Sequence, residues 1–185
     1  MKTRLVVLTI VTLVAMSSLA NADFLRPVES VEPEDCDVVL PPGATVTVYV
    51  IQKLSNGSLG CEWRVANPTE VGILSVNSSF PFTGDPFAGI KFTYSTCQTG
   101  KFVVCELTLI NLGLDHCSRM AIVGLYGNGN FPTYTNCAGT TFFSGPAGDI
   151  IYNTPTSNCS PSYDSCLLPV SNESSTWGAV KSLYR

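Results

Sequence analysis

The chain has 185 residues, with 14 acidic against 10 basic side chains and a formal net charge of −4. This balance argues against nucleic acid or an anionic membrane surface as the main partner, because both attract basic surfaces. Beyond the first residues, no stretch approaches the roughly 18 consecutive apolar residues that a membrane span needs. We therefore expect no membrane span.

The first residues have the pattern of a secretory signal. Lys2 and Arg4 precede a short apolar run over residues 5–15, and an Ala-Asn-Ala cleavage pattern ends at Ala22. We expect residues 1–22 to be a signal peptide and the mature protein to be secreted and extracellular. Its removal leaves eight basic against 14 acidic side chains, a net charge of −6, and about 160 residues, enough for one domain with a hydrophobic core.

The acidic segment 23–35, which contains Pro27 and Pro33, is predicted as an extended lead-in. Short segments with strand-like alternation follow, separated by Gly-, Pro- and Asn-rich turns. They span residues 44–51, 61–65, 71–76, 89–94, 102–110, 120–125, 140–143 and 149–152. Because no later window keeps a helical period, the pattern predicts an all-β sandwich. The polar segment 168–185, which includes Trp177, is predicted as a C-terminal tail that either frays or docks as an edge strand or peptide.

All eight cysteines follow the predicted signal peptide: Cys36, Cys61, Cys97, Cys105, Cys117, Cys137, Cys159 and Cys166. An even number in an exported chain favours four disulfides, because the secretory route is oxidising. The sequence has no C-x-x-C pair and a single histidine, so we expect no zinc site.

Several spacings point to one family. Cys36 leads into "VVLPPGATVTV", and Cys61, Trp63 and Val65 fit a C-x-W-x-aliphatic pattern. The second half of the pattern is matched by Cys117, Cys137, Gly139, Thr140 and Ser144. Over residues 36–167 the chain resembles a CUB domain, of the kind found in secreted arthropod proteins and beside serine protease domains.

The resemblance implies a disulfide-stapled, jelly-roll-like β-sandwich over residues 36–167. It implies the disulfides Cys36–Cys61 and Cys117–Cys137. Given these two, elimination pairs Cys97 with Cys105 and Cys159 with Cys166, a pairing that spacing alone leaves open. Trp63 would then pack against the first disulfide inside the sandwich.

The chemistry of a CUB calcium site or of a hydrolase is missing from the sequence. No acid precedes Cys61, and Arg119 and Met120 occupy the places where the calcium-binding acid is expected, so we predict no metal and no other cofactor. His116 lies between Asp115 and Cys117, and no serine motif of a hydrolase occurs. We therefore predict that the protein is not an enzyme.

Two sets of residues remain as candidate surface features. The pattern N-x-[ST] marks possible glycan acceptors at Asn56, Asn77, Asn158 and Asn172. Aromatic side chains in Gly- and Pro-rich loops form a candidate binding-loop set of Phe80, Phe82, Phe87, Tyr126, Phe131 and Tyr134. The alternative for these aromatics is that they fold inward and cap the sandwich.

These observations favour a non-catalytic binding module that recognises an extracellular protein or glycan, with an arthropod venom or salivary gland as the setting that the resemblance suggests. Regulation or inhibition of secreted serine proteases is the alternative, and a structural matrix component is a third possibility.

Overall fold

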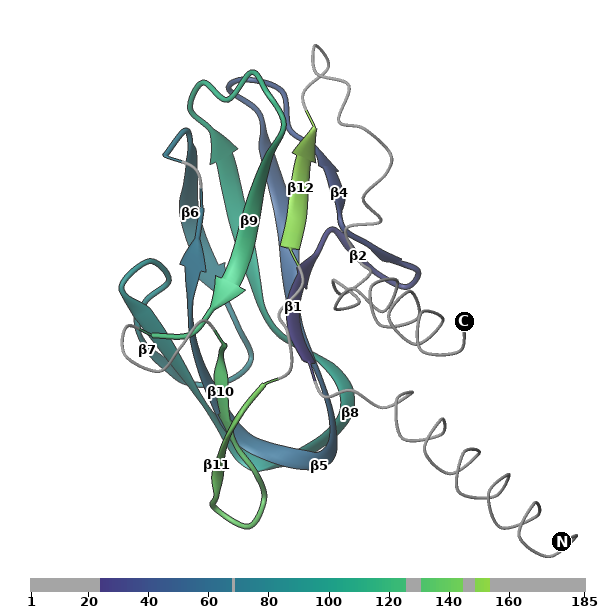
Figure 1. The fold of residues 1–185 in the computed structure, drawn as a ribbon, viewed down its shortest axis with the longest axis vertical. Helices are drawn as coiled ribbons and strands as arrows, with labels where there is room; N and C mark the ends of the chain where they lie inside the picture. The colour runs from purple at the N-terminus through teal and green to yellow at the C-terminus, as the bar shows by residue number, and fades with distance from the viewer. Residues whose placement is uncertain (1–23, 68, 126–130, 145–148, 154–185) are drawn as a thin grey trace, which may run out of the picture.

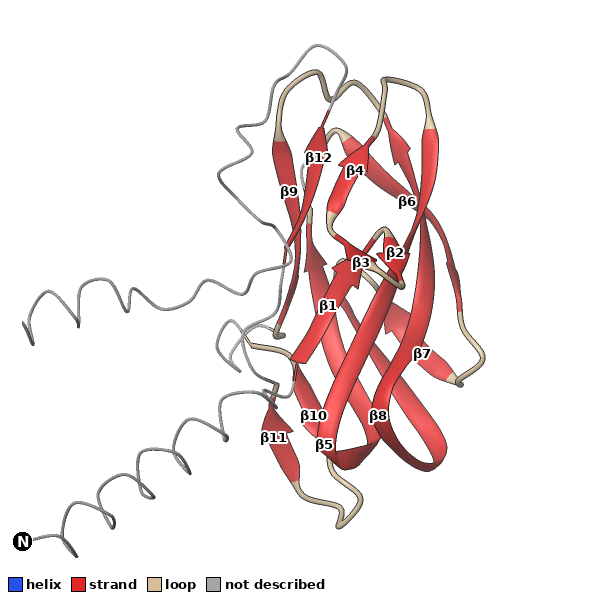
Figure 2. Cartoon of the chain, turned by 90° about the vertical axis from the view of Figure 1, so that its right-hand side faces the viewer, coloured by secondary structure: helices blue, strands red, loops and turns tan. Residues whose placement is uncertain are grey.

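The computed structural model describes residues 24–67, 69–125, 131–144 and 149–153. The predicted signal peptide and C-terminal tail lie outside these ranges. The described part contains β-strands and no helix, and hence no helix that could cross a membrane (Figure 2). The strands are β1 (Phe24–Val28), β2 (Ser30–Val31), β3 (Glu34–Asp35), β4 (Asp37–Val39), β5 (Thr45–Ala66), β6 (Val71–Asn77), β7 (Phe82–Asp85), β8 (Gly89–Asn111), β9 (Ser118–Val123), β10 (Thr133–Thr135), β11 (Thr141–Phe143) and β12 (Asp149–Asn153).

Two long strands, β5 and β8, form the frame of the molecule. They pair antiparallel from Thr45 opposite Ile110 to Trp63 opposite Ile90, and both curve around the lower end in Figure 1. Register shifts between residues 54 and 60 of β5 are β-bulges, which bend a strand without ending it. The predicted strands 44–51 and 61–65 are thus two halves of β5, and 89–94 and 102–110 are two halves of β8.

The bent ribbon divides the sheet into two facing layers. Layer A contains β6, residues 100–111 of β8, residues 45–54 of β5, and β1. Layer B contains β7, residues 89–98 of β8 and residues 58–66 of β5, together with β10, β11, β9, β12 and β4. One 10-stranded sheet therefore folds back on itself as a jelly-roll β-sandwich, and the predicted all-β class is confirmed.

The core lies between the layers, because alternate residues of each strand point inward. Val48, Leu107 and Leu109 enter it from layer A, and Trp63 and Phe92 enter it from layer B. Trp63 is fully buried and stacks on Phe92 with 5.7 Å between ring centroids. The prediction that Trp63 faces the core is confirmed.

The segment before Cys36 belongs to the domain. β1 pairs with β5, and Leu25 and Val28 are fully buried. The β2–β3 hairpin then lies over the outer face of layer A, where Arg26 pairs with Glu34 and Lys101 pairs with Glu34 across the hairpin. The predicted domain boundary at residue 36 is therefore too late, because an extended segment that alternates apolar side chains can add a strand to the sheet.

One buried polar side chain organises the end of the sandwich opposite the bend. Asn111 Nδ2 donates to the carbonyl oxygens of Leu40 (2.7 Å) and Leu114 (2.8 Å). Its Oδ1 accepts from the backbone N–H groups of Gly113 (2.8 Å) and Leu114 (2.6 Å). Asn111 is 1% exposed, and its whole hydrogen-bonding capacity is used within the fold.

Candidate functional site

Near the bend, layer B presents β7, β8, β5, β10 and β11 side by side, with β10 and β11 at the lower end in Figure 1. The strand registers align side chains into rows across these strands. One row consists of Phe82, Phe92, Cys61, Tyr134 and Phe142. The rows on either side of it consist of Thr83, Lys91, Glu62, Thr133 and Phe143, and of Thr93, Gly60, Thr135 and Thr141. Successive residues of a strand point to opposite faces, so the first row faces away from the other two.

The first row faces the core. Phe92 is 1% exposed, Cys61 3% and Tyr134 6%. At its two ends, Phe82 packs on Phe92 with 5.4 Å between centroids, and Phe142 stacks on Tyr134 at 5.8 Å. The two flanking rows consequently face solvent.

These outward rows form a surface that we call the threonine face. It consists of Glu62, Lys91, Thr93, Thr133, Thr135, Thr141 and Phe143. A hollow of about 320 Å³ lies among these strands. Phe143, 61% exposed, lies on β11 opposite Thr133 and is not part of the lining of the hollow. The Thr135 and Thr141 hydroxyls lie 3.4 Å apart. The face therefore combines short polar side chains, one acidic and one basic group, and an aromatic edge.

Gly60 keeps the middle of the threonine face shallow. A Cβ atom at this position would lie 2.4 Å from the Phe92 carbonyl oxygen, so a side chain would push β5 away from β8. Beneath it, the buried Ser58 hydroxyl lies 2.9 Å from the Gly60 carbonyl oxygen and 3.2 Å from that of Thr135. The Ser58 side chain thus links β5 to β10 and fixes the spacing of the face.

A disulfide holds the same strands together at the bend. Cys97 of β8 bonds to Cys137, which follows β10, although β5 lies between β8 and β10. The bridge passes over Gly57, where a Cβ atom would lie 2.7 Å from both sulfur atoms. The bond joins residues 40 positions apart. In the chain-entropy model such a loop is worth roughly 4 kcal/mol.

The predicted disulfide pairs involving these cysteines are wrong. Cys97 bonds to Cys137, and Cys61 and Cys105 are buried free thiols, which excludes Cys36–Cys61, Cys117–Cys137 and Cys97–Cys105 in this structure. Alternation places both free thiols on the inner faces of their strands, away from the predicted partners.

Cys36 and Cys117 are also disulfide-bonded. They precede β4 and β9, which flank β12 and run antiparallel to each other, so they are more than two strand spacings, roughly 9.6 Å, apart. This separation is too large for a bond between them. The predicted pair Cys159–Cys166 lies outside the described residues.

The predicted binding-loop aromatics do not act as one set. Phe82, Phe87 and Phe131 are 40%, 44% and 47% exposed. Tyr134 is buried, and Phe80 packs against the core. Tyr126 lies outside the described residues. The inward alternative thus applies to two members of the set, because Phe80 turns its ring toward the core from the β6–β7 connection and Tyr134 is an inward-facing residue of β10.

The remaining site predictions concern single residues. His116 is exposed and contacts only the neighbouring Asp115, at 3.1 Å, among the contacts described for it. Within the described residues, no group of three His, Cys, Asp or Glu side chains could hold a metal ion. The candidate glycan acceptors Asn56 and Asn77 are exposed, and Asn77 donates to Glu106 at 3.2 Å. Asn158 and Asn172 lie outside the described residues.

Comparison with known proteins finds similar proteins among solved structures alone. No family model and no curated sequence matches the chain. A cohesin from the archaeon Archaeoglobus fulgidus superposes with a TM-score of 0.53 and 10% identity, over 72% of this chain and 91% of its own. A type II cohesin from the cellulosome of Acetivibrio cellulolyticus gives 0.54 and 11%, over 71% and 95%. CaCohA2 of Clostridium acetobutylicum, solved in complex with CaDoc0917, gives 0.50 and 14%, over 72% and 99%.

The chain therefore has the jelly-roll fold of cohesin modules, and the resemblance to a CUB domain is wrong. The structural neighbours named above are cohesins, and none of them is a CUB domain. The C-x-W pattern at Cys61 and Trp63 arises because both residues face the core from one strand, and it does not mark the predicted Cys36–Cys61 disulfide.

The threonine face was not anticipated from the sequence. Thr133 and Thr135 alternate with Tyr134, a period-two signal, but it is only three residues long and lies after a glycine-rich stretch. Thr141 and Phe143 fall in a predicted strand. Alternation could have assigned each residue to a face; it could not show that β10 pairs with β5, which brings them together.

Proposed function

We propose that the protein is a secreted, non-catalytic module that binds another extracellular protein through the threonine face. The observation that carries the proposal is this face: two outward rows of mostly uncharged side chains over a hollow of about 320 Å³, held by Ser58 below and by the Cys97–Cys137 disulfide at the bend. A binding surface on paired strands is rigid before the partner arrives, which lowers the entropic cost of association.

The side chains of the face suit protein recognition. Threonine is short and stiff at χ1, so few torsions are frozen on binding. Charge is confined to Glu62 and Lys91, which lie opposite each other on β5 and β8, and Phe143 supplies an exposed aromatic ring at the margin. Centres of protein interfaces are likewise depleted in charge and enriched in aromatic residues.

The dimensions favour a protein over a glycan. The five strands are together about 19 Å wide, because neighbouring strands lie about 4.8 Å apart. This width greatly exceeds a single sugar ring, and the exposed ring of Phe143 is not part of the lining of the hollow, where a sugar would stack on it. One structural neighbour, CaCohA2, was solved in complex with another protein, which lends support to a protein partner for this fold.

Layer A offers less free surface. The β2–β3 hairpin lies over part of its outer face, and the candidate glycan acceptor Asn77 is exposed on another part of it.

The named neighbours come from bacteria and an archaeon and lend no support to a venom or salivary setting. Secretion rests on the pattern of residues 1–22.

The test compares two arginine substitutions of exposed or half-exposed threonines in strands. Thr135→Arg fills the hollow of the threonine face, whereas Thr47→Arg lies on the outer face of layer A and serves as the matched control. The wild-type protein first captures its partner from the extracellular fluid of the source, and the purified partner is then titrated against each variant.

We expect Thr135→Arg to weaken binding at least tenfold and Thr47→Arg to leave it unchanged, with the melting temperature of both variants close to that of the wild type. Equal binding by Thr135→Arg and the wild type would place the interface elsewhere. A loss confined to Thr47→Arg would assign it to layer A.

A further inference from the structure

The two free thiols enter the core from opposite layers. Cys61 lies on the layer B half of β5, and Cys105 lies on the layer A half of β8, opposite Val50. Cys61 is 3% exposed, Cys105 1% and Val50 0%, so all three face the interior. Near the bend the two layers converge, which brings inward side chains of opposite layers together.

A small polar cluster lies beside Cys61. The Tyr94 hydroxyl donates to Gln52 Oε1 at 2.8 Å, and it lies 3.1 Å from Cys61 Sγ. Burial raises the pKa of Cys61 to about 12. Burial also raises the pKa of Cys105 well above its ordinary value. Gln52 lies two residues from Val50 on β5, and Val50 is paired with Cys105, so the cluster that contacts Cys61 also reaches the strand pair that carries Cys105.

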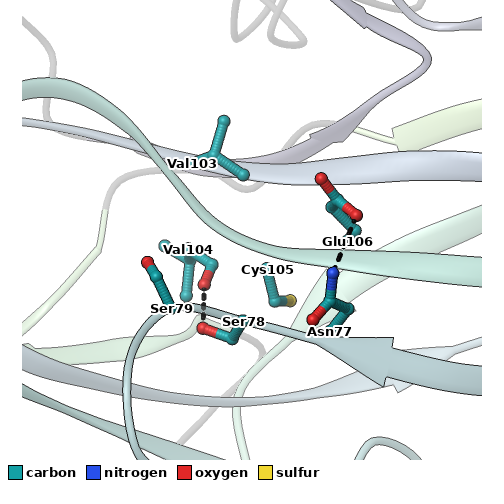
Figure 3. Close-up of a pocket in the computed structure, with 7 residues that line it drawn as sticks. All are labelled: Asn77, Ser78, Ser79, Val103, Val104, Cys105 and Glu106. Carbon is teal, nitrogen blue, oxygen red and sulfur yellow. Dashed lines mark hydrogen bonds between the residues drawn. The ribbon is translucent and has the colours of Figure 1, made fainter.

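The connection between β6 and β7 closes the open side of the sandwich beside this cluster. Phe80 inserts its ring against Tyr94, with 4.6 Å between centroids, and against Phe102 at 6.0 Å. The Ser78 hydroxyl donates to the Val104 carbonyl oxygen at 2.6 Å (Figure 3).

Outside this closure lies a hollow of about 400 Å³. It is lined by Asn77, Ser78, Ser79, Val103, Val104, Cys105 and Glu106 (Figure 3). Cys105 thus lines an outer hollow and also belongs to the core cluster that contains Cys61.

We propose that Cys61 and Cys105 are joined by a disulfide bond across the two layers in the secreted protein. An exported chain meets an oxidising environment, in which paired neighbouring thiols form disulfides. The other described cysteines, Cys36, Cys97, Cys117 and Cys137, are already disulfide-bonded. A cross-layer disulfide beside a buried tryptophan is also a stable arrangement in immunoglobulin sandwiches, and Trp63 faces the core two residues after Cys61.

The bond forms by two thiol–disulfide exchanges with a disulfide of the secretory route, either a protein oxidoreductase or glutathione disulfide. The Cys105 thiolate attacks one sulfur of the oxidant and releases the other as a thiolate, and the Cys61 thiolate then attacks Cys105 Sγ and releases the second. The pair loses two electrons and two protons, and the oxidant becomes two thiols. Burial keeps both thiols protonated in the folded protein, so exchange requires that they first become accessible to the oxidant.

Thiol counting on protein secreted from an oxidising host tests the proposal. The protein is unfolded in guanidinium chloride without reductant and alkylated with iodoacetamide, because buried thiols do not react in the native state. We expect no alkylation at Cys61 or Cys105 and a non-reduced peptide that links them. Alkylation of both residues, or a bond from either to another cysteine, would overturn the proposal.

Single substitutions provide the controls. Cys105→Ala should leave Cys61 as one alkylated thiol, and Cys61→Ala should leave Cys105 as one. Cys97→Ala also frees one thiol, at Cys137, and should leave the Cys61–Cys105 peptide intact. If a variant fails to fold, the peptide map of the wild-type protein still decides the question.

Discussion

Gly57 is a position beside the threonine face where the fold leaves no room for a side chain. The Cys97–Cys137 disulfide passes over it, and a Cβ atom would lie 2.7 Å from both sulfur atoms and 3.0 Å from Thr99 Cγ2. Its φ of +69° is also a left-handed conformation that L side chains rarely adopt. Gly57→Ala therefore combines a backbone penalty with a steric one.

Gly100→Ala is the control that separates the backbone penalty from the steric penalty. Its φ is +78°, but a Cβ atom at this position would have no heavy atom within 4 Å beyond its chain neighbours. Gly100→Ala should therefore cost about 1 kcal/mol, the strain of a left-handed alanine. Gly57→Ala should cost about 1–3 kcal/mol more, because the disulfide is tied to strands on both sides and overpacking in such places costs this much.

Urea unfolding with the disulfides intact measures both costs from the shift in midpoint at constant slope. Gly57→Ala should also weaken partner binding, since displacing the disulfide moves Cys137 and with it the end of β10. Equal destabilisation by the two alanine variants would refute the claim that the disulfide packs on Gly57.

Two further predictions concern buried polar groups. Asn111→Ala removes four hydrogen bonds and should lower the free energy of unfolding by about 4 kcal/mol, at roughly 1 kcal/mol each. Asn136→Ala, at a more exposed asparagine, is the control and should lower it by less than about 1.5 kcal/mol. Equal urea midpoints for the two variants would count against the Asn111 network. Asn111→Asp places a carboxyl group against the Leu40 and Leu114 carbonyl oxygens, which raises the pKa of that carboxyl group in the folded state. The loss of unfolding free energy relative to the wild type should therefore grow as pH rises above about 4. Burial raises the pKa of Tyr152, whose neutral form therefore stabilises the fold below about pH 10, and this stabilisation is lost as pH rises further. Tyr152→Phe loses the hydrogen bond to Asn67 and should be about 1 kcal/mol less stable than the wild type at pH 7. Above pH 10 the stability of the two proteins should converge. A stability difference that does not change with pH would contradict this.

Local alternation predicted the strands well, because the side-chain period is a property of each segment. Val48 and Val50 in β5, and Cys61 with Trp63 later in the same strand, face the core as their spacing indicates. The turn formers at Asn56 and Gly57 misled the division of β5, because a positive-φ glycine serves equally in a turn and in a bulge.

Contacts between distant segments could not be predicted in the same way. The pairing of β10 with β5 creates the threonine face, and the crossing of Cys97 to Cys137 over β5 depends on it. Nothing in the spacing of the cysteines specifies that Cys61 and Cys105 point inward from opposite layers. The short β1 was read as a lead-in because Pro27 lies within it, although on an edge strand a proline need not interrupt pairing.

The central claim is that a protein partner docks on layer B near the bend. Amide hydrogen exchange of the protein with and without its purified partner tests this most directly. The account predicts added protection at residues 91–93, 133–135 and 141–143, and none at residues 45–49 or 106–110 of layer A. Protection confined to layer A, or none at the threonine face, would contradict it.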